Sequence, residues 1–353
     1  RAARAQNALV QAVELLALLG RLQALGLGRR RVVDEVGLDR VVLLEEIRHV
    51  HDQVAHHRQA GQRRQLGEHL LAVLLAAVDA DRGVLRVQQG GDGRPVVLIH
   101  GWPLNADSWA PQVGALRDAG YRVVTYDRRG FGRSDKPLIG YTYESLSDDL
   151  SAVLEELDLR DVTLVGFSMG GGEVASYCAR KGTERIRSAA FAASVTPFMQ
   201  HRKDNPEGPL GKVEAAKMAA ALTANQDSFY EQMMADVFSV DGRLAINEEQ
   251  RRWALAMCGE ASKAAALACM AAFGGTDFRE DLPKVTVPSL VIHGDSDATV
   301  PFEGSGRRTH EALPDSRLHV IAGGPHGIPV SHPDEFNDVL LTFLAEDFTT
   351  RAT

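Results

Sequence analysis

The stretch Val162-Thr-Leu-Val-Gly-Phe-Ser168-Met-Gly-Gly-Gly-Glu-Val-Ala175 decides the fold. Its first residues are apolar or β-branched and predict a buried strand, whereas the small residues from Gly170 onward are compatible with a helix. Between them lies G-F-S-M-G, a G-x-S-x-G pattern that is typical of a sharp strand-to-helix turn. Such a turn strains the backbone of Ser168 and leaves no room for a side chain at Gly166 or Gly170. The pentapeptide also arises by chance in glycine-rich chains, so the flanking patterns are what favour a nucleophilic serine.

Strand and helix patterns alternate through residues 81–346, which we expect to form one α/β domain. Residues 196–275 are rich in Ala and Met and show helical spacing without strand alternation, which predicts a helical cap insertion over the site. The alternation predicts a mostly parallel sheet with helices on both faces, and ligands then bind at the carboxyl ends of the strands. The predicted strands are 84–87, 95–99, 121–126, 162–165, 186–193, 287–293 and 317–321, and the predicted helices outside the cap are 107–119, 142–157, 303–312 and 333–345.

Bulk properties restrict the class of protein. The chain has 353 residues and a net charge of −8, which argues against a nucleic-acid partner. No uncharged apolar run of about 18 residues exists, so we expect no membrane span. The three cysteines are odd in number and lack C-x-x-C spacing, which favours buried, reduced thiols and a cytoplasmic location.

Residues 1–80 differ in composition from the rest of the chain. They contain no Ser, Thr, Pro, Lys, Cys, Met or aromatic residue, and Arg exceeds Asp plus Glu by two. Three interpretations stay open: a helical appendage, a disordered extension, or non-native sequence translated upstream of the true start. His51, His56 and His57 have no carboxylate or cysteine at ligand spacing, so we expect no metal there. We expect a chain starting near Asp79 to fold and to be about as active as the whole chain. Residues 347–353 are interpreted as a C-terminal tail.

A serine nucleophile needs a base, and the base needs an acid that orients it. His326 is the predicted base, since it lies in a Gly/Pro-flanked loop after the last strand. His293 ends a strand and is expected to be a core or supporting residue. Asp295 and Asp297 both follow that strand, and either carboxylate could serve as the acid. The order Ser, Asp, His is the one expected of an α/β-hydrolase.

The oxyanion hole requires backbone amides that face the developing negative charge. Met169 follows the nucleophile, and Trp102 lies in His100-Gly-Trp-Pro103 after the first long strand, so their amides are the candidates. Trp102 is also compatible with a hydrophobic plug. The segment 127–135 lacks G-K-[ST] and is interpreted as a turn-rich packing loop.

Together, HGWPLNADSW, YDRRGFGRSD, GFSMGGGEVA, VIHGDSDATVPFE and GGPHGIPVSH resemble the α/β-hydrolase superfamily. More narrowly, they are similar to the cofactor-free (non-haem) haloperoxidase, aryl esterase and perhydrolase family, over residues 84–346. The resemblance implies Ser168, His326 and Asp297 as the triad and the amides of Trp102 and Met169 as the oxyanion hole. It implies Pro103 as a feature of peracid-forming members, and an acyl pocket that includes Val195, Met199, Phe229, Phe238 and Phe302.

The resemblance implies a serine esterase that needs no cofactor or metal. A small carboxylic ester or acid acylates Ser168, and hydrogen peroxide as co-substrate releases a peracid. The alternatives are a lactone or C–C bond hydrolase with the same triad, and a ligand-binding homologue with negligible turnover. No membrane partner is expected, and homo-oligomerisation is left open.

Overall fold

A computed structural model describes residues 84–346, and the predictions for residues 1–80 and for the tail lie outside the described residues. Seven strands form one sheet in the order β1-β3-β2-β4-β5-β8-β9. Only β1 runs antiparallel to its neighbour, and every other pair is parallel. The strands are β1 (Val87–Gly90), β2 (Pro95–Ile99), β3 (Arg122–Tyr126), β4 (Val162–Phe167), β5 (Ile186–Ala192), β8 (Ser289–Gly294) and β9 (Ser316–Ile321).

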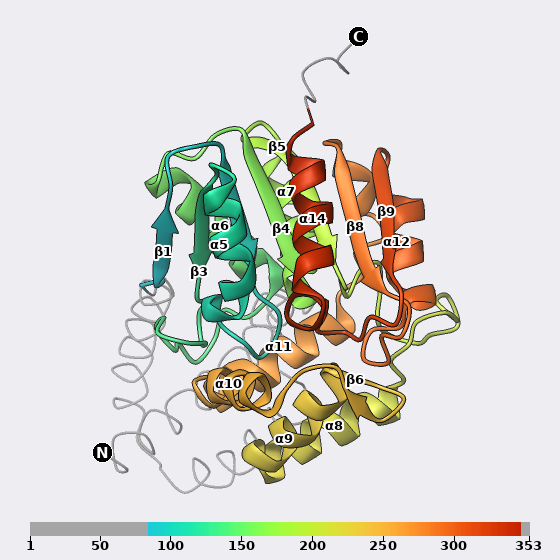
Figure 1. The fold of residues 1–353 in the computed structure, drawn as a ribbon. Helices are drawn as coiled ribbons and strands as arrows, with labels where there is room; N and C mark the ends of the chain where they lie inside the picture. Colours follow the sequence, from blue (N-terminus) through green and yellow to red (C-terminus); the bar gives the residue numbers. More distant parts are fainter. Residues whose placement is uncertain (1–83, 347–353) are drawn as a thin grey trace, which may run out of the picture. The chain divides into compact units, whose positions relative to one another are not determined.

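The central strands are almost fully buried, as expected for a parallel sheet that is covered on both faces. All six residues of β4 are buried, and so are all six of β8. Helices α5 (Ala110–Asp118) and α14 (Pro333–Leu344) pack together on one face, and α6 (Tyr143–Glu156) and α7 (Met169–Lys181) pack together on the other (Figure 1). The short helix α13 (Ile328–Ser331) contacts α5 and α14, whereas the short helix α12 (Gly306–Ala312) packs against β8 and β9. The predicted α/β fold with a mostly parallel sheet is confirmed.

The chain between β5 and β8 forms a group of helices near the carboxyl ends of the strands (Figure 1). Asn225, Asn247 and Ser262 each cap the start of a helix through a side-chain oxygen, which explains where three of these helices begin. The helices are α8 (Lys212–Ala224), α9 (Gln226–Val237), α10 (Glu248–Gly259) and α11 (Lys263–Gly275). We call residues 196–275 the cap.

Two details of the sequence prediction were wrong. The first strand begins at Val87 rather than Val84, because residues 84–86 bond to a loop: the amides of Val84 and Arg86 donate to the side chains of Asp135 and Ser134. The cap also contains a small hairpin, β6 (Ser239–Val240) and β7 (Arg243–Leu244). Its turn is Asp241-Gly242, both at positive φ, which is the turn chemistry that favours a two-residue hairpin.

Within residues 84–346, no single helix is long and apolar enough to cross a membrane. Taken together, α10 and α11 have the length and apolar composition of a membrane span, but they meet at a bend of 100°.

Candidate active site

Ser168 lies at the tip of the sharp turn between β4 and α7. Its backbone has φ 54° and ψ −117°, a strained conformation for a residue with a side chain. The turn is so tight that a methyl group on Gly166 would strike the carbonyl of Gly170, and one on Gly170 would strike the carbonyl of Ile99. The serine side chain is therefore held at the carboxyl edge of the sheet, as the G-x-S-x-G pattern predicts.

Three side chains from distant parts of the chain form a hydrogen-bonded row. Ser168 Oγ lies 2.9 Å from His326 Nε2, and His326 Nδ1 lies 2.7 Å from Asp297 Oδ2. The carboxylate can only accept, so the imidazole carries its proton on Nδ1 and leaves Nε2 free to accept from the serine hydroxyl. All three residues are buried. The geometry is that of a nucleophile, a base and an orienting acid.

Asp297 is held in its charged form by its surroundings. Burial alone would raise the pKa of this carboxyl, but His326 and His293 more than offset burial, so the pKa lies well below its usual range. The other oxygen, Oδ1, accepts from the amides of Thr299 at 2.9 Å and Val300 at 2.7 Å. Each oxygen therefore has fixed donors, and the carboxylate cannot rotate without losing them.

Asp295, the alternative acid, bonds to other partners than the imidazole, whose Nδ1 contacts Asp297. Asp295 Oδ1 accepts from the amide of Gly323 at 2.7 Å, and its side chain is exposed. It ties the turn after β8 to the loop that leads to His326. Ser296 Oγ in the same turn also donates to Oδ1, at 2.9 Å, so Asp295 has one partner within its own turn and one in the later loop.

His293 is a supporting residue that the sequence only partly anticipated. Its Nε2 lies 2.8 Å from the carbonyl of Val300 and 3.2 Å from Asp297 Oδ2. Both partners are acceptors, so Nε2 carries the proton and donates. His293 Nδ1 is buried without a hydrogen-bond partner among the described residues. The His293 imidazole therefore adds a second donor to the carboxylate that contacts His326.

The loop after β2 passes directly over the nucleophile. A methyl group on Gly101 would lie 3.2 Å from Ser168 Cβ and 2.7 Å from Phe167 Cδ1. The next residue, Trp102, is therefore close to Ser168. Met169 is the first residue of α7, so the free amides and the positive dipole end of this helix also lie beside Ser168. This placement fits the amides of Trp102 and Met169 as donors to an oxyanion.

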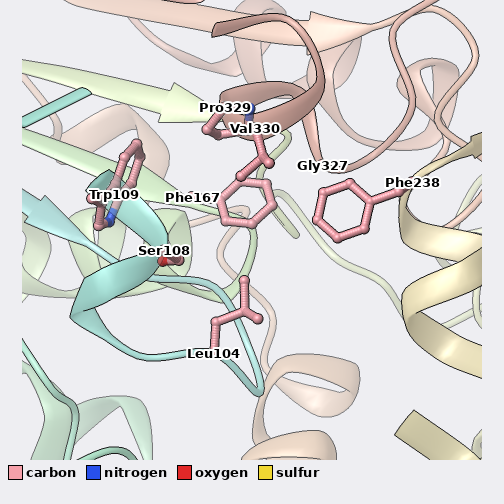
Figure 2. Close-up of a pocket in the computed structure, with 8 residues that line it drawn as sticks. All are labelled: Leu104, Ser108, Trp109, Phe167, Phe238, Gly327, Pro329 and Val330. Carbon is pink, nitrogen blue, oxygen red and sulfur yellow. The ribbon is translucent and has the colours of Figure 1, made fainter. Parts of the chain in front are cut away.

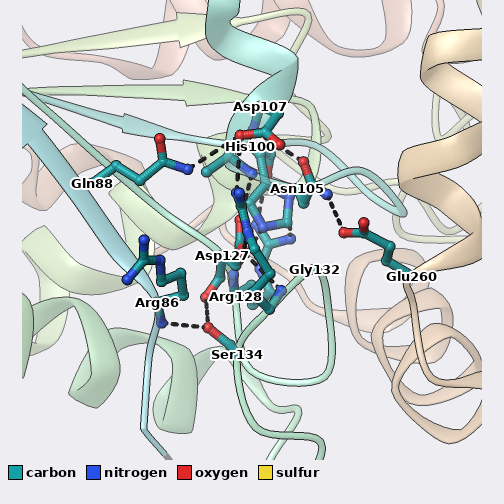
Figure 3. A network of polar contacts seen from close by, with 12 residues as sticks. Arg86, Gln88, His100, Asn105, Asp107, Asp127, Arg128, Gly132, Ser134 and Glu260 are labelled. Atoms are coloured by element: carbon teal, nitrogen blue, oxygen red, sulfur yellow. Dashed lines mark hydrogen bonds and ion pairs between the residues drawn. The ribbon is translucent and has the colours of Figure 1, made fainter.

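Arg128 bonds to His100 at the start of this loop and holds it in place (Figure 3). The Arg128 guanidinium donates to the carbonyl of His100 at 2.6 Å, and the Arg128 amide donates to His100 Nε2 at 2.9 Å. Nε2 therefore accepts, and Nδ1 donates to the carbonyl of Gly101 at 2.8 Å. Burial, helped by the Arg128 charge, keeps the pKa of His100 well below its usual range, so the ring stays neutral.

Glu173 balances the charge of Arg128. The two form a fully buried ion pair, and Tyr126 Oη donates to Glu173 at 2.9 Å. The sequence analysis missed this pair and described 127–135 only as a packing loop. A glutamate inside the small-residue start of α7 was the available signal, since a buried charge needs a partner.

The cap bonds to the same loop. Trp102 Nε1 donates to the carbonyl of Ala266 in α11 at 3.0 Å, and Asn105 Nδ2 donates to Glu260 at 2.8 Å. The Trp102 ring also lies against Phe229, with centroids 6.2 Å apart. Trp102 is thus both a hydrophobic plug and the carrier of a candidate oxyanion amide.

The structure gives one contact each for four of the residues expected to form an acyl pocket. The amide of Val195 bonds to the carbonyl of Ser168 at 3.3 Å, so Val195 lies beside the nucleophile. Met199 is buried and contacts Ser305 through its sulfur. Phe302 packs on His293, at 5.7 Å between centroids, on the acid side. Phe238 lies against Gly327, next to the base. Pro103 is buried and follows Trp102 through a cis peptide bond.

Among the described residues, no group of three or more His, Cys, Asp or Glu side chains has the geometry to hold a metal ion. The histidines considered in residues 1–80 lie outside that part of the chain.

Comparison with known proteins agrees with the α/β fold. Residues 94–333 match the model of the alpha/beta hydrolase fold family. A non-heme chloroperoxidase of Kitasatospora aureofaciens is 42% identical over 259 residues, 72% of this chain and 93% of the relative. A bifunctional esterase/perhydrolase of Acinetobacter calcoaceticus is 36% identical over 255 residues, 71% and 91% of the two chains.

Among solved structures, a bromoperoxidase from Bacillus anthracis has 47% sequence identity and a TM-score of 0.74, over 75% of this chain and 96% of that one. The family match covers well over half of the chain, and the relatives are matched over nearly their whole length. The chain belongs to the alpha/beta hydrolase fold family, with non-heme haloperoxidases and esterases among its relatives.

Proposed function

We propose that this hydrolase is a serine esterase that works through an acyl-enzyme on Ser168. The observation that carries the proposal is the row Ser168, His326 and Asp297, with 2.9 and 2.7 Å between successive polar atoms. His326 Nε2 takes the hydroxyl proton as Oγ attacks the ester carbonyl. The amides of Trp102 and Met169 stabilise the oxyanion, and His326 returns the proton to the leaving alkoxide.

Deacylation repeats these steps with a second nucleophile. Water, deprotonated by His326, attacks the acyl carbon, and the C–Oγ bond breaks to release the acid. Asp297 stabilises the imidazolium that forms in each half-reaction, because its charge lies 2.7 Å from Nδ1. The substrates are small carboxylic esters, since the site is enclosed by apolar side chains and by the cap.

We further propose that hydrogen peroxide competes with water for the acyl-enzyme and that the product is then a peracid. The support is the likeness to a relative named an esterase/perhydrolase and to others named non-heme haloperoxidases. In this step HOO–H loses its proton to His326, the HOO oxygen binds the acyl carbon, and Ser168 leaves with the proton. Pro103, beside the Trp102 amide, is the residue we assign to this selectivity.

Two measurements on one acyl donor test both parts. With p-nitrophenyl acetate, a pre-steady-state burst of nitrophenol equal to the enzyme concentration is expected when deacylation is slower than acylation. With peroxide at a fixed concentration, peracid and acid are then quantified together. Pro103→Leu is expected to lower the ratio of peracid to acid about tenfold, which requires about 1.4 kcal/mol of differential transition-state binding.

The outcomes separate the two parts of the proposal. Ser168→Ala with near wild-type ester turnover would exclude the serine mechanism. Ester turnover without any peracid from the wild type would leave a simple esterase. Peracid formation with an unchanged ratio in Pro103→Leu would leave a perhydrolase in which Pro103 has no selective role.

A further inference from the structure

A buried ion pair connects the two segments that carry the candidate oxyanion amides. Met169 is the first residue of α7, and Glu173 follows it by about one helical turn. The Arg128 guanidinium, from the loop after β3, donates through Nε to Glu173 Oε1 at 2.5 Å and through Nη2 to the carbonyl of His100 at 2.6 Å. His100 begins the loop that contains Trp102. One guanidinium therefore bonds to both segments.

The two segments also touch at the carbonyl of His100. A methyl group on Gly170 would lie 2.4 Å from the carbonyl oxygen of Ile99 and 3.1 Å from that of His100. The start of α7 thus lies directly on the backbone that leads into the loop. A shift of one segment relative to the other would change the distance between the two candidate amides.

Hydrogen bonds at Gly101 extend this restraint to the Trp102 amide. The His100 ring donates through Nδ1 to the carbonyl of Gly101 at 2.8 Å, and the amide of Leu104 donates to the same oxygen at 3.1 Å. The Gly101 carbonyl and the Trp102 amide belong to one planar peptide unit and point in opposite directions. Fixing the carbonyl therefore fixes the direction of the Trp102 N–H.

Apolar packing alone would not fix this direction. At the far end of the loop, Leu104 lines a small apolar pocket together with Phe167 and Phe238, whose rings face each other across it (Figure 2). Contacts of this kind are non-directional, and the pocket leaves some space unfilled. The orientation of the peptide unit therefore depends on the hydrogen bonds made by His100 and Arg128.

Stability alone does not account for the ion pair. The side chains of Arg128 and Glu173 are both 0% exposed, and removing their charges from water costs about as much as their attraction returns. Apolar residues of similar volume often replace buried ion pairs without loss of stability. A planar guanidinium offers what an apolar pair lacks, because its fixed fork of donors holds two acceptors at a set distance and angle.

We infer that Arg128 and Glu173 are positioning residues that hold the amides of Trp102 and Met169 at the spacing required by an oxyanion. The inference rests on the proposed esterase function. Amides placed in advance stabilise the developing charge without reorganisation, and this stabilisation is lost when a donor is displaced. Both side chains act through the backbone segments that they hold.

The test uses a double variant of the full chain, Arg128→Met with Glu173→Gln. It removes both charges together, so no unpaired charge stays buried, and the carboxamide introduced at position 173 keeps an acceptor for Tyr126 Oη. The backbone amide at position 128 still donates to His100 Nε2, since the main chain makes that bond. The variant is therefore expected to fold, which circular dichroism and urea unfolding check.

The readout compares the affinities of two ketones of similar size. Trifluoroacetophenone forms a hemiketal with a catalytic serine, and its oxyanion requires both amides, whereas acetophenone binds without a covalent bond. The wild type is expected to prefer the trifluoromethyl ketone strongly, as enzymes prefer analogues of the transition state. In the double variant this preference should fall about 100-fold, the usual effect of losing one oxyanion donor, while the affinity for acetophenone stays the same.

Ester hydrolysis gives a second readout. The kcat/KM for phenyl acetate should fall in the double variant by a factor similar to the fall in ketone preference. The pH at which kcat/KM is half-maximal should not move, because it reports the proton on His326 rather than the oxyanion hole.

Arg129→Met with Asp149→Asn is the matched control. These residues form a mostly buried ion pair that joins the loop after β3 to α6, and its loss is expected to leave the ketone preference unchanged. Arg128→Lys is the second test variant if the double variant does not fold. It keeps a positive charge beside Glu173 but lacks the planar fork, so it is expected to lower the preference in the same direction.

The outcomes distinguish the inference from the function on which it rests. An unchanged ketone preference in the folded double variant, or in folded Arg128→Lys if the double variant does not fold, overturns the inference. Equal losses of affinity for both ketones, or an equal fall in preference in the control variant, overturn it as well, because the ion pair then has no specific effect on the oxyanion. A wild type without Ser168-dependent ester hydrolysis and without any preference for the trifluoromethyl ketone would overturn the proposed function itself.

Discussion

Asp297→Asn tests the orientation of the base. In the wild type, Asp297 Oδ1 accepts from two backbone amides and Oδ2 accepts from His326 Nδ1 at 2.7 Å. Asparagine has one acceptor oxygen, which we expect to keep facing the two amides because they can only donate. Its NH₂ group then faces His326 and forces Nδ1 to accept.

That exchange reverses the tautomer of the imidazole. A proton on Nε2 points at Ser168 Oγ, and the base can no longer take the hydroxyl proton. With the geometry intact, loss of a triad carboxylate in this way lowers kcat by about 10⁴-fold, or about 5.5 kcal/mol of transition-state stabilisation. The assay is p-nitrophenyl acetate hydrolysis at neutral pH, with circular dichroism to confirm folding.

Asp295→Asn is the matched control. Its side-chain carbonyl can still accept from the Gly323 amide, so turnover is expected to stay close to that of the wild type. If folded Asp297→Asn retains more than about a tenth of the activity, or if Asp295→Asn is the more damaging variant, the assignment of the acid is refuted.

Three other predictions concern stability and reactivity. Glu173→Gln leaves the buried Arg128 charge without its partner and is expected to lower the free energy of unfolding, measured with urea, by about 3–5 kcal/mol. The substitution Glu144→Gln, at an exposed residue, should lower it by less than about 1 kcal/mol. Similar losses in the two variants would contradict the role given to the buried ion pair. Because the pKa of Asp297 is lower in the folded state than in the unfolded chain, its contribution to stability is present above about pH 4 and is lost as the pH falls further. The difference in unfolding free energy between wild type and Asp297→Asn should therefore narrow below pH 4, and a constant difference would exclude this linkage. Burial raises the pKa of the Cys178 and Cys269 thiols to about 12 and that of the Cys258 thiol well above its usual range. Ellman's reagent should therefore label none of these three buried cysteines in the native protein and all three after unfolding. Rapid labelling of the native protein would contradict their burial.

Much of the fold was predictable because its signals are local. The elbow around Ser168 depends on glycines a few residues apart, and β2 begins and ends where its apolar run does. His326 stood out through its Gly/Pro-flanked loop. Each of these features is determined by residues within a short segment and does not depend on contacts with distant residues.

Features set by distant contacts could not be predicted in the same way. The carboxylates of Asp295 and Asp297 are two residues apart, and only the three-dimensional path of the later loop shows that one faces the imidazole and the other an amide. The start of β1 depends on bonds to Ser134 and Asp135, about 50 residues away. The Asp241-Gly242 dipeptide is typical of a hairpin turn, but the hairpin was missed because the surrounding cap sequence has helical spacing.

The positions of the aromatic residues expected to contact the substrate could not be predicted from the sequence either. Resemblance grouped Phe238 and Phe302 in one pocket, whereas the structure places one beside Gly327 and the other against His293. Aromatic residues in a cap carry no sequence signal for the face they cover. Their positions are therefore known only from the packing in the structure.

Covalent labelling tests the central claim most directly. The full chain is incubated with a fluorophosphonate and digested, and the modified peptide is identified by mass spectrometry. One adduct per chain is expected, on Ser168, with labelling slowed strongly in Asp297→Asn and not in Asp295→Asn. Absence of an adduct, or an adduct on a different residue while esters are still hydrolysed, would contradict a mechanism that passes through Ser168.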